Sequence, residues 1–155
     1  MPGVVARERF LAARVARLAT VSESGAPHLV PVTFAVIPGT STPPEVADAE
    51  RPAGESTELI VFAVDHKPKS TTALRRLDNI AANPRVAFLV DVYDDNWDQL
   101  WWVRADAVAS PIDGNSREGA VVALRTKYPQ YDARPPDGVV VGAAVLGWSG
   151  WQAAP

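Results

Sequence analysis

Apolar residues recur along the chain with two different spacings, and these divide it into expected strands and expected helices. Runs rich in β-branched and aromatic residues predict strands, whereas apolar residues three and four positions apart predict helices. Strands are expected at residues 16–22, 28–37, 58–64, 85–93, 97–110 and 138–148. Helices are expected at residues 6–15, 70–82 and 114–127.

Turn residues separate these elements. The stretch SESGAP at 22–27 contains Gly25 and Pro27, so the strands on either side of it are expected to pair as a hairpin. Pro31 has no N–H group to donate to a neighbouring strand, which predicts an edge position or a bulge for 28–37. The stretch PQYDARPP at 129–136 is expected to be a loop.

Residues 38–57 differ from the rest in composition. They hold four prolines, two glycines and several acidic residues, without any apolar periodicity. This pattern predicts a long exposed loop. Only 37 residues precede it, so it is read as an insertion in a single domain spanning 1–155. The order α-β-β-β-α-β-β-α-β, with short turns between most strands, predicts an α+β fold built on a small antiparallel barrel with helices at its rim.

The composition limits the classes of function. The chain has 155 residues, 47% of them hydrophobic, and a formal net charge of −3, which argues against a general nucleic-acid binder. It has no cysteine, which excludes disulfides and thiolate metal sites and fits a reducing compartment. The longest apolar run, at 139–148, is shorter than the roughly 20 residues that a membrane-spanning helix needs. A cytoplasmic protein without a membrane segment is therefore expected.

A basic segment precedes the second expected helix. DHKPKSTT at 65–72 places two lysines and several hydroxyl groups where a helix N-terminus exposes unpaired N–H groups, and a proline limits the freedom of the loop. Anions bind readily in such a position. The segment is a candidate phosphate cradle; the alternative is an ordinary polar loop with Ser70 as the N-cap. The candidate residues are Lys67, Pro68, Lys69, Ser70 and Thr71.

Tryptophans cluster in the fifth expected strand. If 97–103 is extended, Trp97 and Trp101 lie on one face and Trp102 on the other. One face would pack on the core, and the other would be covered by a partner subunit or a flat aromatic cofactor; core packing alone is the alternative. Trp148, near the C-terminus, is read in the same way.

Side chains typical of catalysis or metal binding are scarce. There is no cysteine, no GxSxG or HExxH motif, and the two histidines are far apart in sequence. The stretch DDNWDQ at 94–99 lacks the glycine and the glutamate of a calcium loop, so no metal is expected. If the protein is an enzyme, a cofactor is expected to supply the chemistry.

Two motifs together resemble a known family. The hairpin ARLATVSESGAPHLVPV and the stretch HKPK followed by NIAANPRV are similar to the pyridoxamine 5′-phosphate oxidase-like superfamily, and more narrowly to its actinobacterial branch of probable coenzyme F420-dependent oxidoreductases. The resemblance covers roughly residues 7–150 apart from the 38–57 stretch. The family usually has a short turn where this chain has that insertion, which is either a surface loop or a lid.

The resemblance implies a mainly antiparallel split β-barrel that forms a homodimer, with flavin-like cofactors in the grooves between subunits. The strand after the first turn would lie along the cofactor ring, and the basic segment would bind its phosphate or acidic tail. The partner would complete the groove with residues of later strands. The residues implied are Val30, Pro31, Val32 and Thr33 for the ring, Lys67, Lys69, Ser70 and Thr71 for the tail, and Trp101, Trp102 and Trp148 for the groove.

The function that the resemblance implies is transfer of a hydride between reduced coenzyme F420 and a small organic acceptor. No strong acid is needed, because water or a hydroxyl such as that of Thr33 could deliver a proton. Two alternatives stay open. One is an oxidase or reductase that uses flavin mononucleotide (FMN) on the same fold, and the other is a non-catalytic protein that binds a flavin, a deazaflavin or haem.

Overall fold

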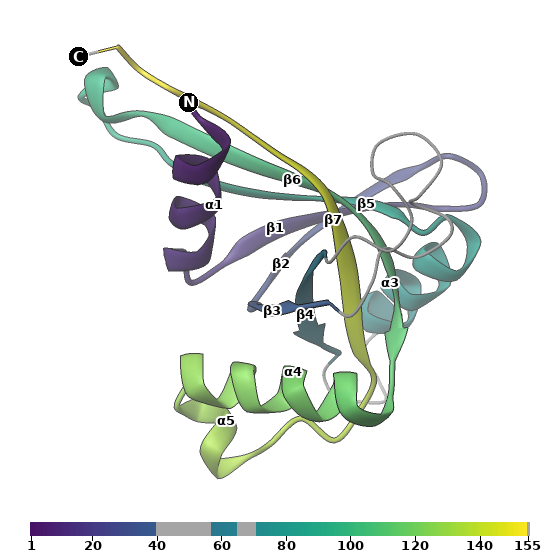
Figure 1. The fold of residues 1–155 in the computed structure, drawn as a ribbon. Coiled ribbons are helices and arrows are strands. Elements are labelled where there is room, and N and C mark those ends of the chain that lie inside the picture. The colour runs from purple at the N-terminus through teal and green to yellow at the C-terminus, as the bar shows by residue number, and fades with distance from the viewer. Residues whose placement is uncertain (40–56, 65–70, 155) are drawn as a thin grey trace.

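The computed structural model describes residues 1–39, 57–64 and 71–154. The part of the chain that is described forms helices, strands and one 3-10 turn, and Figure 1 labels the helices and strands. The strands are β1 (Ala16–Val21), β2 (Pro27–Val32), β3 (Ala35–Pro38), β4 (Glu58–Ala63), β5 (Arg85–Val92), β6 (Trp101–Ile112) and β7 (Val140–Gln152). The helices are α1 (Gly3–Ala12), α3 (Thr71–Ala82), α4 (Gly114–Lys127) and α5 (Gln130–Ala133), and the 3-10 turn is η1 (Trp97–Gln99).

The described strands form one antiparallel sheet. Their order is β2-β1-β5-β6-β7-β4-β3, so β2 and β3 lie at its two edges although they follow each other in the chain. The expected α+β class, with a mainly antiparallel sheet and a few peripheral helices, is confirmed. The edge position predicted for the strand that contains Pro31 is confirmed as well.

The predicted first hairpin is present. Strands β1 and β2 pair antiparallel, with Ala16 opposite Val32 and Val21 opposite Pro27. Gly25 has a φ of 89°, a conformation that glycine adopts without steric cost. The Ser22 hydroxyl accepts a hydrogen bond from the Ala26 N–H at 3.0 Å and so closes the turn.

One expected strand, 28–37, is in fact two. The chain leaves β2 at Val32, passes through Thr33 and Phe34, and enters β3 on the opposite edge of the sheet. The amide and carbonyl of Phe34 bond the Tyr128 hydroxyl at 3.0 and 2.9 Å instead of a neighbouring strand. The prediction of a continuous strand was wrong. The interruption depends on hydrogen bonds to Tyr128, which lies 94 residues further along the chain and so gives no signal in the local sequence.

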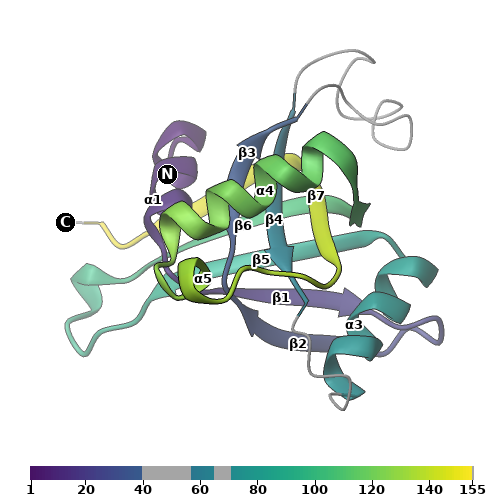
Figure 2. The same cartoon turned by 90° about the horizontal axis from the view of Figure 1, so that it is seen from below.

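Helices cover the sheet in different places. Helix α1 inserts the fully buried Phe10 into the main core, where its ring centroid lies 4.7 Å from that of Phe34. Helix α4 packs Ala120 and Leu124 over β3 and β4 in a second apolar cluster, and Figure 2 shows it crossing these strands. Helix α3 contacts β1, where the buried Asn79 donates a hydrogen bond to the Thr20 hydroxyl at 3.0 Å.

The end of the β5–β6 hairpin and the last residues of β7 project together from the rest of the sheet, at the upper left of Figure 1. The expected strand 97–110 starts later than predicted, because Trp97–Gln99 is a 3-10 turn in which the Asn96 side chain accepts a hydrogen bond from the Asp98 amide. Trp97 belongs to this turn and not to β6, so placing it with Trp101 on one strand face was wrong; its side chain is 72% exposed. The last strand extends to Gln152, beyond its predicted end.

Smaller differences concern the helices. The first helix spans Gly3–Ala12 rather than 6–15, and Val15 lies outside it. The stretch 129–136, expected to be a loop, contains the short helix α5. Of the helices that the structure describes, none has the length and apolar character needed to cross a bilayer.

Candidate functional site

A pocket of about 310 Å³, called the junction pocket below, lies where β2 and β4 end. Its walls come from four separate parts of the chain: the end of β2, the end of β4, helix α3, and the segment that begins at α5. Such convergence of distant segments on one concavity is typical of ligand sites. The lining residues are Pro31, Val32, Thr33, Ala63, Val64, Arg76, Tyr131, Arg134 and Pro136.

The junction pocket combines an apolar wall with positive charge. Pro31, Val32 and Val64 offer apolar surface against which a flat ring can pack, and Arg76 and Arg134 supply two guanidinium groups. No carboxylate lines the pocket in the part of the chain that the structure describes. The arrangement therefore suits a ligand with an apolar planar part and an anionic part.

Arg76 is the cation on the α3 side of the junction pocket. Its side chain is partly buried, and its Nε atom is buried without a hydrogen-bond partner among the residues that the structure describes. Burial lowers the pKa of Arg76 from its ordinary value, because the charged form loses hydration there. A buried donor that lacks an acceptor costs free energy, and an anionic ligand that accepted from the Arg76 Nε would relieve that cost.

The Thr33–Phe34 segment between β2 and β3 is held by two tyrosines. The Tyr128 hydroxyl accepts a hydrogen bond from the Phe34 amide at 3.0 Å, and its single proton is donated either to the Phe34 carbonyl at 2.9 Å or to the Arg14 carbonyl at 2.8 Å. The Tyr131 hydroxyl lies 3.1 Å from the Thr33 Oγ1. Burial raises the pKa of Tyr128 above its ordinary value. The tyrosines thus fix the part of the junction pocket that Thr33 forms.

Lys127 lies beside this segment. Its Nζ is 3.7 Å from the centroid of the Phe34 ring, and the Arg14 guanidinium donates to the Lys127 carbonyl at 2.7 Å. Burial, with a smaller contribution from the charge of Arg14, lowers the pKa of Lys127 to about 8. Lys127 does not line the junction pocket, and its contacts connect the ends of α1 and α4 to Phe34.

Several residues predicted from the sequence lie at the junction pocket, and others do not. Pro31, Val32 and Thr33 line it, whereas Val30 packs against the main core beside them. Lys67, Pro68, Lys69 and Ser70 lie outside the described residues, and Thr71 is the first residue of α3. Their predicted role at a phosphate stays a prediction.

The three predicted tryptophans do not line the junction pocket within one protomer. Trp148 packs against the core, with its ring centroid 5.0 Å from that of Phe10. The Arg9 guanidinium lies over the ring of Trp101, 5.0 Å from the ring centroid. Trp101 and Trp102 line a different, mainly apolar hollow on the projecting hairpin, together with Tyr93 and Trp151. Their predicted role in a groove depends on a second subunit.

Sequence reasoning missed Arg76, Tyr131 and Arg134 as pocket residues. Arg76 lies on the polar side of an amphipathic helix, which is also where a solvated arginine is found. Tyr131 and Arg134 belong to a stretch with the composition of a plain loop. Only the fold shows that all three face the end of β2.

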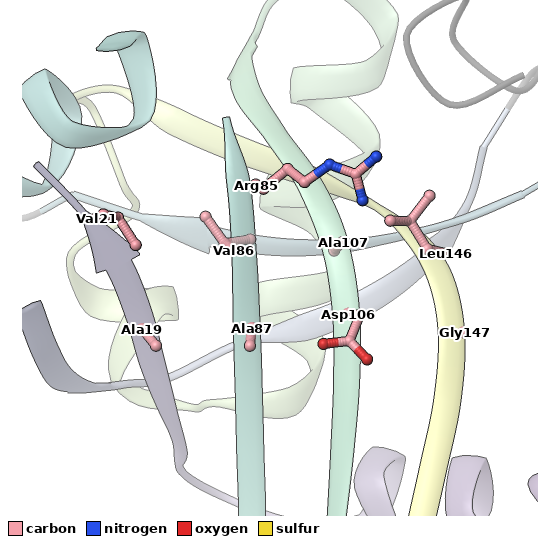
Figure 3. Close-up of a pocket in the computed structure, with 9 residues that line it drawn as sticks. All are labelled: Ala19, Val21, Arg85, Val86, Ala87, Asp106, Ala107, Leu146 and Gly147. Carbon is pink, nitrogen blue, oxygen red and sulfur yellow. The ribbon is translucent and has the colours of Figure 1, made fainter. Parts of the chain in front are cut away.

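A second concavity, of about 370 Å³, is lined by residues of β1, β5, β6 and β7, which Figure 3 draws as sticks. Small residues from adjacent strands form its floor, because Ala19 pairs with Ala87, Ala87 with Asp106, and Asp106 with Gly147. Figure 3 shows the Arg85 side chain extending across β6 near Ala107 toward Leu146. We call this concavity the sheet trough. Its charged lining residues in the described part of the chain are Arg85 and Asp106, whose charges are opposite, so it is a weaker candidate for an anionic ligand.

Comparison with known proteins identifies a family. The family model described as pyridoxamine 5′-phosphate oxidase matches residues 5–152. This range includes every described residue that lines the junction pocket. None of the curated proteins matches the sequence.

Solved structures share the fold at low sequence identity. The conserved hypothetical protein Rv2991 from Mycobacterium tuberculosis is 22% identical with a TM-score of 0.66, and the match covers 98% of this chain and 85% of that one. An FAD-binding protein from Mesorhizobium loti is 17% identical with a TM-score of 0.60, covering 97% and 92%. The haem storage protein HutZ from Vibrio cholerae is 14% identical with a TM-score of 0.59, covering 98% and 95%. Shared architecture in this group therefore accompanies different ligands.

Proposed function

Because the chain belongs to the pyridoxamine 5′-phosphate oxidase family and has its split-barrel fold, we propose that it is a cytoplasmic oxidoreductase that uses coenzyme F420. The proposed reaction transfers a hydride between the deazaflavin and a small organic acceptor. The observation that carries the proposal is the junction pocket, in which residues expected to contact a cofactor ring lie beside two arginines.

The residues of the junction pocket fit an anionic, flavin-like group. Val32 is buried in β2, and Pro31 and Thr33 on either side of it are exposed. The buried Nε of Arg76, which has no partner among residues 1–39, 57–64 and 71–154, is a donor suited to a phosphate or carboxylate oxygen. Lys67 and Lys69 follow the pocket-lining Val64 along the chain, and we propose that they add charge for the same anion.

The bound cofactor would supply the hydride chemistry, and the protein would bind and orient it and exclude water. The apolar wall of Pro31 and Val32 would contact one side of the ring, and Arg76 would hold the negative charge. The hydroxyl pair of Thr33 and Tyr131, 3.1 Å apart, can pass a proton to an acceptor beside the ring. No side chain with a strongly acidic pKa is needed for this step.

FMN on the same fold is the second candidate, because Arg76 and the apolar wall also suit a flavin with one phosphate. Among the structural neighbours, one is described as an FAD-binding protein and another as a haem storage protein. A binder without catalytic activity would show cofactor affinity but no oxidation of reduced cofactor on adding an acceptor.

Titration of the purified protein with cofactors, followed by tryptophan fluorescence, tests the proposal. We expect oxidised coenzyme F420 to quench the fluorescence at low micromolar concentration or below and to bind more tightly than FMN. Reduced coenzyme F420 should then be oxidised in the presence of an electron-poor alkene. Preference for FMN would support the second candidate, and binding of neither cofactor would contradict the proposal.

We also propose that the protein is a homodimer and that the junction pocket is completed by the second subunit. Its volume of about 310 Å³ lies at the lower limit for small-molecule sites. The sheet trough offers a surface for such a dimer. In a two-fold interface the same patch meets itself, so the small residues of the trough can receive exposed apolar side chains such as Leu29 and Leu89 of the other copy.

Filling the sheet trough should therefore separate the subunits. Ala87→Lys places a long charged side chain in the middle of the trough, where a single protomer leaves room for it. We expect the wild type to sediment as a dimer and Ala87→Lys as a monomer. Val122→Lys is the matched control, because Val122 is 63% exposed on helix α4, away from the trough. A monomeric wild type, or a dimeric Ala87→Lys variant, would contradict the proposed interface.

A further inference from the structure

We infer that Arg134 is a specificity-determining residue, which binds a second anionic group of the ligand beyond the group held by Arg76. The junction pocket would then favour a cofactor with an extended anionic tail over a flavin with a single terminal phosphate. This inference rests on the proposed function, since it assumes that the junction pocket is the cofactor site.

The two arginines reach the junction pocket from different elements and differ in exposure. Arg76 comes from α3 and is partly buried, whereas Arg134 follows α5 and is exposed. If the ligand had a single small anionic group, held by Arg76, the exposed Arg134 would have no role in binding. A tail that leaves the pocket toward solvent would pass from the inner arginine to the outer one.

The backbone that carries Arg134 is held on both sides, so its side chain starts from a defined position. On the N-terminal side, the Tyr131 amide donates to the Tyr128 carbonyl at 3.0 Å. On the C-terminal side, the Arg117 Nη2 donates to the carbonyls of Pro136 and Gly138 at 3.3 and 3.0 Å. Pro136 is buried and lines the same pocket.

The charge of Arg134 is not used by a neighbouring acid in the part of the chain that the structure describes. Asp132, two residues away, forms an ion pair with Arg125 at 3.2 Å. The charge of Asp132 therefore balances that of Arg125. Arg117 is engaged by backbone carbonyls. Arg134 is thus the arginine of the α4–α5 region that lines the junction pocket and has no ion pair with a described residue.

The ligand chemistry that would use Arg134 is a second phosphate or a carboxylate, several bonds beyond the first phosphate. Coenzyme F420 carries carboxylates in its acidic tail, and FAD carries a second phosphate in its diphosphate, whereas FMN ends at one phosphate. Because Arg134 is exposed, its contact is screened by solvent and salt. We expect it to change affinity by about three- to tenfold, less than a buried contact would.

Three ligands and three proteins test the inference. Oxidised coenzyme F420, FAD and FMN are each titrated into the wild type, Arg134→Ala and Arg125→Ala at low and at high salt. Arg125→Ala is the matched control, since it removes an exposed guanidinium from the same region without touching the junction pocket. We expect Arg134→Ala to lose affinity for coenzyme F420, FAD or both, with unchanged affinity for FMN, and to lose less at high salt.

The outcomes separate this inference from the proposed function. Equal loss for all three ligands, or no loss for any, would show that Arg134 does not recognise a tail, while the cofactor site itself would stand. Loss with FAD but not with coenzyme F420 would identify a diphosphate as the group that Arg134 contacts, and the reverse result would identify the carboxylate tail. Binding of none of the three by the wild type would overturn the proposed function and this inference together.

Discussion

Replacing Arg76 with alanine is expected to weaken the binding of coenzyme F420 and of FMN alike. Arg76 lines the junction pocket with a partly buried side chain whose Nε has no hydrogen-bond partner in the described part of the chain. Hydrogen bonds to charged groups contribute about 1.5–3 kcal/mol each, so the loss in affinity should be roughly 10- to 100-fold. The dissociation constants from fluorescence titration measure it directly.

The same substitution should leave the fold as stable as before. The charge of Arg76 is partly desolvated without a compensating acid in the described part of the chain, and removing such a charge relieves a cost of folding. We therefore expect the midpoint of thermal unfolding to stay the same or to rise. Reduced affinity together with a large fall in stability would instead identify Arg76 as a structural residue.

Arg75→Ala provides the control for Arg76→Ala. It removes the same charge one position earlier on α3, from an exposed side chain that does not line the junction pocket. Its effect on affinity should be small and should disappear at high salt, because it acts only through the long-range potential. Equal losses for the two variants would contradict the specific role assigned to Arg76.

The sequence predicts those parts of the fold that local chemistry determines. The first hairpin follows from Gly25 and its neighbours, and the start of α3 lies within one residue of its predicted position. The edge position of β2 follows from Pro31, because proline has no N–H to donate. The family resemblance adds Pro31, Val32 and Thr33 as candidate site residues, and these do line one pocket.

The rest depends on contacts between residues far apart in sequence. The stretch Val32–Val36 has the composition of a strand, and only the Tyr128 hydroxyl, 94 residues beyond Phe34, shows why the strand is interrupted. The Asn96 side chain bonds the Asp98 amide and converts an expected strand start into a 3-10 turn. Arg76 and Arg134 are 58 residues apart, and no periodicity along the chain relates them.

Replacing Tyr128 with phenylalanine is expected to lower the free energy of unfolding substantially. The Tyr128 hydroxyl accepts from the amide of the fully buried Phe34 and donates its single proton to the carbonyl of either Phe34 or Arg14. Removing it leaves buried backbone groups without a partner, at about 1–3 kcal/mol per group, so we expect a loss of about 2–4 kcal/mol. The phenylalanine ring keeps the apolar packing, and the effect is therefore specific to the hydroxyl.

Tyr131→Phe is the matched comparison for Tyr128→Phe. It removes a hydroxyl from the adjacent turn of the chain, but one whose partner, the Thr33 Oγ1, is exposed to water. Water can replace that partner, so the loss of stability should be only about 0.5 kcal/mol. Chemical denaturation of both variants measures the difference, and equal effects would contradict the assignment of Tyr128 as the residue that holds Phe34. Because Phe34 adjoins Thr33, Tyr128→Phe should also weaken cofactor binding at temperatures where the variant is still folded, which connects the stability of this segment to the proposed site.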